Sequence, residues 1–100
     1  MSAYAALAEP NRRAILELLR TGERSVGDLV EALPVGQPAV SKHLGVLREA
    51  GLVAARAEGR RRVYALRPDP LAEVDAFLEP YRAFWSDRLD ALERHLEDNP

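Results

Sequence analysis

The stretch that decides the fold is GQPAVSKHLGVLREAG, residues 36–51. If it forms a helix, Val40, Leu44 and Leu47 recur on one side, at the spacing of a buried helix face. Pro38 stands in the first turn, where a helix tolerates proline, and the last glycine stands where helices commonly end. The polar residues of the stretch then fall on the faces that remain in solvent.

A second helix is predicted directly before this stretch. Ser25 can cap its first turn, with Asp28 three residues further on as the capping-box partner. Apolar residues then recur at helical spacing as far as Leu33, and residues 34–36 (Pro-Val-Gly) break the helix. Two helices separated by so short a break indicate a tight helix-turn-helix. An earlier helix opens near Pro10, and residues 2–8 are a further helical candidate.

The period of the pattern changes after residue 51. Residues 52–57 and 62–66 have the pattern of two short strands. Residues 58–61 would join them as a hairpin turn, with Gly59 supplying a positive φ. We therefore predict a mainly α fold with a two-stranded β wing, that is, a winged helix-turn-helix over residues 1–70.

The last segment, residues 71–100, has a long helical pattern and is predicted to belong to the same single domain. Pro80 lies inside it and should kink or split the helix. We expect the apolar stripe of this helix to form a homodimer interface, because such a stripe on an acidic helix needs a partner surface. The alternative is that the stripe packs on its own subunit. Its members are Leu71, Val74, Leu78, Tyr81, Trp85, Leu89, Leu92 and Leu96.

Length and composition limit the other possibilities. With 100 residues, 47% of them apolar and 30% charged, the chain fits one folded domain rather than a disordered segment. It has no cysteine, which excludes disulfides and thiolate metal sites. No apolar stretch is long enough to cross a bilayer, and the first residues do not resemble a secretion signal. We expect a cytoplasmic protein that has no membrane partner.

The charge is unevenly distributed along the chain. The formal net charge is -2, but residues 1–70 carry a balance of +3 and residues 71–100 a balance of -5. A surface that binds nucleic acid needs local positive charge rather than a basic total. The acidic net charge therefore does not exclude double-stranded DNA as the partner of the predicted helix-turn-helix and wing.

The second helix of a helix-turn-helix enters the major groove with its first residues at the base edges. Gln37 can pair with adenine, and Ser41 can bond to a base or a phosphate. Three arginines at the hairpin tip suit the minor groove or flanking phosphates. The alternative is an ordinary solvated surface; Arg12 and Arg13 could also touch the DNA backbone. The predicted DNA-binding residues are Gln37, Pro38, Ala39, Ser41, Lys42, His43, Arg48, Arg60, Arg61 and Arg62.

Other chemistry has little support. Ser41 and His43 are two residues apart on a helix and do not face each other, so they form no catalytic pair. No glycine-rich phosphate loop is present. His95 has acidic neighbours, but their spacing is not diagnostic of zinc. We predict a protein that is not an enzyme and that has no metal and no cofactor.

Several motifs resemble those of the ArsR family of bacterial winged-helix repressors. Residues 7–16 (LAEPNRRAIL) resemble the family's opening, residues 37–44 (QPAVSKHL) its recognition helix, and residues 47–53 (LREAGLV) its exit turn. Residues 59–66 (GRRRVYAL) resemble its wing. Residues 81–92 look like the tail of a non-metal branch of the family.

The resemblance implies a homodimeric repressor that binds an imperfect palindrome in a promoter, with the first and last helices forming the dimer. The missing cysteine pair departs from the metal-sensing members, Gly36 replaces a frequent serine, and Pro80 interrupts the last helix. An adaptor that binds another protein through the last helix is the main alternative. The adaptor would explain the apolar stripe but not the arginine-rich hairpin. The effector that would control the protein remains unknown.

Overall fold

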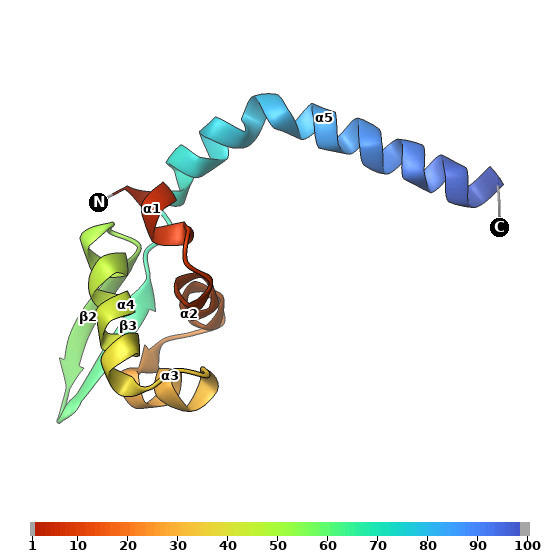
Figure 1. The fold of residues 1–100 in the computed structure, drawn as a ribbon. Coiled ribbons are helices and arrows are strands. Elements are labelled where there is room, and N and C mark those ends of the chain that lie inside the picture. Colours follow the sequence, from red (N-terminus) through yellow and green to blue (C-terminus); the bar gives the residue numbers. More distant parts are fainter. Residues whose placement is uncertain (1, 99–100) are drawn as a thin grey trace.

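The computed structural model describes residues 2–98, apart from the side chains of Leu89 and Asp98. Within that part, a short α1 precedes a helix, a strand and two helices, and a hairpin leads into the long last helix (Figure 1). The elements are α1 (Ala3–Leu7), α2 (Pro10–Arg20), β1 (Arg24–Ser25), α3 (Val26–Ala32), α4 (Gln37–Glu49), β2 (Val53–Glu58), β3 (Arg61–Leu66) and α5 (Leu71–Asp98).

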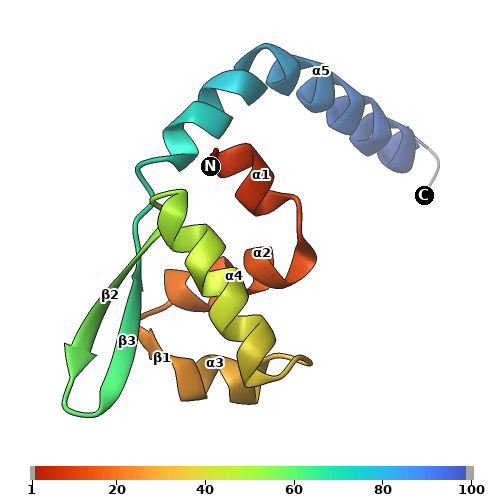
Figure 2. The same ribbon diagram turned by 60° about the vertical axis from the view of Figure 1, so that its left-hand side comes forward.

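A single core lies between α1–α4 and the sheet, which enclose it in a compact body (Figure 2). The helix faces predicted from apolar spacing are buried there, as expected for amphipathic helices. The largest fully buried side chains are Ile15, Leu29, Val40, Leu44, Leu47 and Leu52.

The predicted helix-turn-helix is present as α3 and α4. Ser25 Oγ accepts the Asp28 backbone N–H at 3.1 Å, and Asp28 Oδ2 accepts the Ser25 backbone N–H at 3.0 Å. This reciprocal capping box confirms the predicted start of α3 and satisfies two backbone donors. Gly36 is the N-cap of α4 and offers no side-chain oxygen, so the first turn of α4 keeps unbonded N–H groups.

The sheet has three antiparallel strands in the order β1-β3-β2, one strand more than the two-stranded wing that we predicted. The additional strand, β1, pairs Arg24 with Tyr64 and Ser25 with Val63. Strand β1 could not be predicted from the sequence, because two residues are too few to show an alternation of apolar and polar side chains. In addition, Ser25 carries the signal of a helix N-cap rather than that of a strand. The hairpin of β2 and β3 is the wing. Gly59 has φ 62° at its turn, as predicted.

Helix α5 leaves the body and extends to one side, giving the molecule extents of 59 × 29 × 20 Å (Figure 1). It is one helix that contains Pro80, so the chain is not split there. Figure 1 shows that α5 changes direction within its blue-green part, which is the kink that an internal proline produces by removing a backbone donor. No helix in the described part of the chain is both long and apolar enough to span a membrane.

Candidate nucleic-acid interface

A cleft of about 720 Å³ lies between α4 and the wing. Three parts of the chain line it: the start of α3, one face of α4, and the wing. The cleft therefore brings together the two predicted DNA-binding segments, the recognition helix and the wing, which lie more than ten residues apart in the sequence. The lining residues are Ser25, Val26, Gly27, Gln37, Ser41, Gly45, Arg48, Arg60, Arg61, Arg62 and Tyr64.

Helix α4 turns a mixed polar and small face toward this cleft. Gln37, Ser41 and Arg48 are exposed, and all three line the cleft beside the buried face of the helix. Gly45 lies on the same face, and a Cβ built there would meet nothing within 4 Å. A large ligand could therefore closely approach the backbone of α4 at Gly45, near the middle of the helix.

The other predicted residues of α4 lie beside this face. Pro38 and Lys42 are exposed, whereas Ala39 is half-buried, and none of the three lines the cleft. They flank the helix start at positions where a ligand wider than the cleft would reach them.

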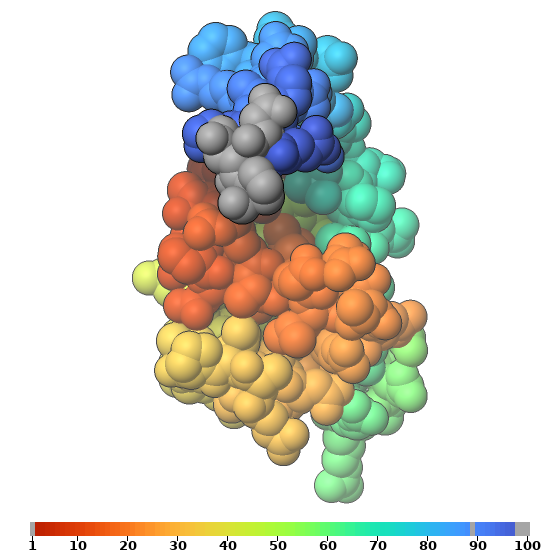
Figure 3. Space-filling model, turned by 90° about the vertical axis from the view of Figure 1, so that its right-hand side faces the viewer, coloured from red at the N-terminus to blue at the C-terminus, as the bar shows by residue number. Residues whose placement is uncertain are grey.

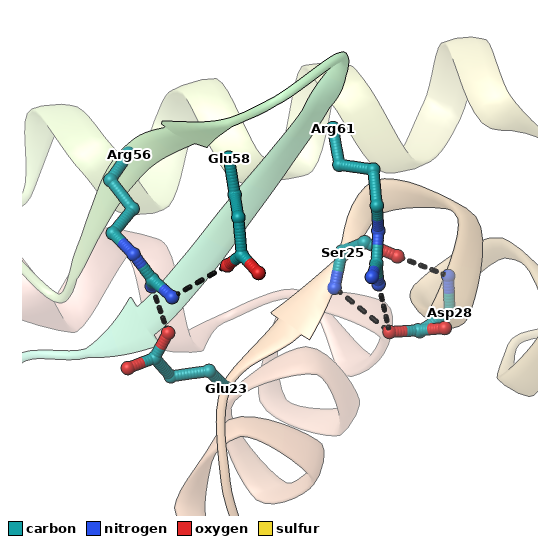
Figure 4. Close-up of polar contacts among 6 residues, drawn as sticks. All are labelled: Glu23, Ser25, Asp28, Arg56, Glu58 and Arg61. Atoms are coloured by element: carbon teal, nitrogen blue, oxygen red, sulfur yellow. Dashed lines mark hydrogen bonds and ion pairs between the residues drawn. The ribbon is translucent and has the colours of Figure 1, made fainter.

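The wing brings three arginines to the cleft. Arg60, Arg61 and Arg62 are all exposed, and Arg60 and Arg62 make no ion pair or hydrogen bond with any described residue. Arg61 Nη2 lies 3.5 Å from Asp28 Oδ2 at the start of α3 (Figure 4). The cleft thus has a strongly cationic wall and a single nearby carboxylate contact.

Arg56 is a fourth wing arginine, and its charge is neutralised elsewhere. It forms ion pairs with Glu23 and, at 2.7 Å, with Glu58 (Figure 4). The hydrogen bond to Glu23 is the largest influence raising the pKa of Arg56 above its usual value. The unpaired positive charge of the wing is therefore concentrated at its tip, on the cleft side.

His43 is a predicted DNA-binding residue that the structure places away from the cleft. Its Nε2 lies 3.7 Å from Oε2 of Glu9, the N-cap residue of α2, and its side chain is only 15% exposed. Burial opposes ionisation of Glu9, but the hydrogen bond from the Arg12 backbone N–H and the nearby His43 lower its pKa overall. His43 therefore links α4 to α2.

Arg12 and Arg13, which we expected to be able to reach DNA, instead hold the end of α1. Arg12 donates to the carbonyl oxygens of Ala6 and Ala5 at 2.7 and 3.1 Å, and Arg13 donates to that of Leu7 at 2.8 Å. Cationic groups at a helix C-terminus satisfy its free carbonyls and its dipole.

Comparison with known proteins shows similarity in sequence and in fold. Residues 9–55 match the model of the family described as "Bacterial regulatory protein, arsR family". The HTH-type transcriptional regulator Rv2034 of Mycobacterium tuberculosis is 49% identical over 84 residues, which cover 84% of this chain and 76% of the relative. The chain belongs to the ArsR family. It is thus a helix-turn-helix transcriptional regulator and not an enzyme.

Two further comparisons agree with this assignment. The transcriptional repressor SdpR of Bacillus subtilis is 31% identical over 70 residues, covering 70% of this chain and 78% of the relative. A crystal structure of a possible transcriptional regulator for arsenical resistance is 43% identical, with a TM-score of 0.70 over 91% of this chain and 92% of that one. The likeness thus includes most of α5 as well as the winged helix.

The predicted stripe of this ArsR-family chain divides into two parts. Leu71 and Val74 pack against the core of their own subunit, and Leu78 is half-buried. The side chain of Leu89 lies outside the described part of the structure. Four members are largely exposed: Tyr81 at 50%, Trp85 at 48%, Leu92 at 54% and Leu96 at 60%.

The structure adds aromatic residues that the sequence reasoning did not include in the stripe. Phe77 and Phe84 are 55% and 58% exposed, and Tyr4 of α1 is 39% exposed. The Tyr4 and Phe77 rings lie edge to face at 5.7 Å, and Tyr4 donates a hydrogen bond to the Glu73 carbonyl at 3.1 Å. The two phenylalanines are seven residues apart, and that spacing would have placed both on one helix face.

No group of three or more His, Cys, Asp or Glu residues that could hold a metal exists among the described residues. The acidic neighbours of His95 on α5 do not form such a group there. The side chain of Asp98, one of these acidic neighbours, lies outside the described part. The charge asymmetry is preserved in space: α5, with its acidic residues, projects from the end of the body away from the wing tip (Figure 1).

Proposed function

We propose that this chain is a repressor that binds a near-palindromic double-stranded DNA site as a homodimer, using α4 and the wing. The observation that carries the proposal is the single cleft lined by Gln37 and Ser41 on one side and by three wing arginines on the other. Side chains that can contact base edges and side chains that can bind phosphates thus line the same cleft.

The chemistry of the cleft fits a duplex. With α4 in the major groove, Gln37 can pair with adenine N6 and N7, and Ser41 can bond to a base edge or a phosphate. Pro38 and Ala39 come close to the DNA at the helix start, and Lys42 and Arg48 suit the phosphates. Arg60, Arg61 and Arg62 reach the flanking phosphates or a narrow minor groove. His43 contributes indirectly, by holding α4 against α2.

The proposed dimer follows from α5. The part of the apolar stripe that includes Trp85 is largely exposed in the single subunit, and the aromatic residues Phe77 and Tyr4 continue it onto α1. Large exposed apolar patches of this kind mark interaction sites. A two-fold dimer would present two copies of α4, about 34 Å apart, to successive major grooves, so the DNA site should be a near-palindrome.

The test is selection of bound duplexes from a random pool, followed by affinity measurements over a salt series. We expect an enriched near-palindrome of roughly 20 base pairs, because two half-sites lie about one helical turn apart. Gln37→Ala should reduce discrimination between sites. Arg60→Ala combined with Arg61→Ala should weaken binding to every sequence and flatten the salt dependence.

Arg20→Ala is the matched control, because Arg20 is exposed, pairs with Glu17 and does not line the cleft. It removes a positive charge from the chain but should leave binding unchanged. Equal affinities for all of these variants and the parent chain would refute the proposal. A chain that enriches no motif would instead be an adaptor that acts through α5.

A further inference from the structure

The carboxylate of Asp28 contacts two different groups, a backbone N–H and an arginine of the wing. It is the third residue of α3, and its Oδ2 accepts the Ser25 backbone N–H at 3.0 Å. The same Oδ2 lies 3.5 Å from Nη2 of Arg61 on the wing (Figure 4). Ser25 and Arg61 both line the proposed DNA-binding cleft, so this contact bridges two of its walls.

The pairing of Asp28 with Arg61 competes with DNA. A guanidinium group binds a carboxylate and a phosphate with the same planar fork of N–H donors. The pKa of Asp28 is lowered, first by the backbone hydrogen bond from Ser25, then by the Ser25 side chain, with a smaller contribution from Arg61. The carboxylate is therefore ionised at neutral pH, and Arg61 has an internal anion as an alternative to a phosphate.

We propose that Asp28 is a specificity-determining residue that withholds Arg61 from non-specific DNA. The proposal rests on the proposed function. In a loosely seated duplex no phosphate is held opposite Arg61, and the arginine stays on Asp28. In the cognate complex the base contacts of α4 fix the duplex, and a phosphate placed at the wing displaces the carboxylate.

Two features of the structure support this exchange. The contact is long and both side chains are well exposed, with 60% of Arg61 and 49% of Asp28 accessible, so the pair is easily broken. Asp28 also remains satisfied after the exchange, because the capping-box hydrogen bonds to Ser25 persist. The carboxylate thus releases Arg61 without losing all its partners.

The test compares Asp28→Asn with Glu31→Gln on the selected site and on an unrelated duplex. Both substitutions remove one negative charge from α3 at a residue that does not itself line the cleft, but Glu31 makes no polar contact with a described residue. Asparagine keeps an oxygen that can accept the Ser25 N–H. We expect Asp28→Asn to bind the unrelated duplex about two- to fivefold more tightly than Glu31→Gln, the range set by an exposed ion pair.

The salt dependence distinguishes the mechanism from a general change of charge. For Asp28→Asn the logarithmic salt slope on unrelated DNA should steepen by about one, because one more phosphate is contacted, and the slope on the selected site should not change. In the Arg61→Ala background, Asp28→Asn should behave like Glu31→Gln. Equal behaviour of the two variants in the parent chain, or an effect that persists without Arg61, would overturn the proposal.

A second comparison leaves the capping box untouched, in case Asp28→Asn destabilises α3. With Asp28 present, Arg61→Ala should weaken binding to unrelated DNA less than Arg60→Ala does, because Arg61 is paired with Asp28 whereas Arg60 has no ion pair with a described residue. Equal losses would also count against the proposal. If the parent chain binds no duplex in a salt-dependent way, the proposed function itself is wrong. If it binds but the comparisons fail, only the role of Asp28 is wrong.

Discussion

At the scale of single residues, Glu9 joins two helices through one side chain. Its Oε2 accepts the Arg12 backbone N–H at 2.9 Å and lies 3.7 Å from His43 Nε2 on α4. The carboxylate form is therefore favoured in the folded chain, and the pKa of Glu9 lies below its ordinary value of 4.5. A lowered carboxyl pKa stabilises the fold above the unfolded value, and this stabilisation is lost as the pH falls through the folded value.

We predict that Glu9→Gln lowers the free energy of unfolding at pH 7, and that its deficit relative to the parent chain shrinks as the pH falls below 4.5. The glutamine side-chain oxygen can still accept the Arg12 N–H. The pH-dependent part of the loss in stability therefore reports the negative charge of Glu9 rather than this hydrogen bond. Urea unfolding at a series of pH values measures it. Glu49→Gln, at an exposed position of α4, should show no such trend. A Glu9→Gln deficit that is constant with pH would contradict the prediction.

Single residues also show which features could be predicted from the sequence and which could not. Helical spacing was enough to predict that Gln37 and Ser41 would be exposed while Leu44 would be buried. It did not show that His43 would face Glu9, because the two residues are far apart in the chain and meet only when α2 packs on α4. For the same reason Arg12 and Arg13 looked like free surface charges, although the turn before α2 aims them at the carbonyls of α1.

At the scale of elements, the positions of the helices and of the hairpin followed from periodicity, caps and glycines. The capping box at Ser25, the proline near the start of α4 and the positive φ of Gly59 are all local signals, and all three were found as predicted. The strand β1 carried no such signal, because two residues show no period. Its existence depends on β3, with which it pairs.

Helix α4 contains a residue at which folding and the proposed binding have opposite requirements. Gly45 lies within the helix, and a Cβ there would meet nothing within 4 Å. Gly45→Ala should therefore stabilise the fold by roughly 0.5–1 kcal/mol, through helix propensity alone. The added methyl group would project into the cleft and should weaken DNA binding severalfold.

Urea unfolding and duplex titration of Gly45→Ala measure the two effects separately. Glu49→Ala is the control, since Glu49 lies on the same helix and does not line the cleft. It should not weaken binding. Tighter or unchanged binding by Gly45→Ala would mean that the middle of α4 does not approach the DNA.

At the scale of the whole molecule, the direction of α5 decides how two subunits could meet. The sequence predicted the apolar stripe of α5, but it did not predict which stripe residues are buried and which are exposed. Helical spacing alone cannot distinguish a residue that packs on the core of its own subunit from one that remains exposed on the surface. Leu71 and Val74 pack on the core of their own subunit, whereas Trp85 and Leu92 are largely exposed. The kink in the helix and the contact of Tyr4 with Phe77 set the angle at which the exposed part leaves the body.

Trp85 makes the proposed dimer directly observable, because it is the only tryptophan in the chain and is 48% exposed in the single subunit. Burial against a second copy should shift its fluorescence to shorter wavelength, and dilution should reverse the shift at the concentration where the measured mass halves. Leu92→Asp, which places a charge on the exposed stripe, should keep the chain monomeric and the emission red-shifted. Arg94→Asp, on the opposite side of α5, should still dimerise. Emission independent of concentration, together with a monomeric mass at micromolar protein, would exclude the α5 interface.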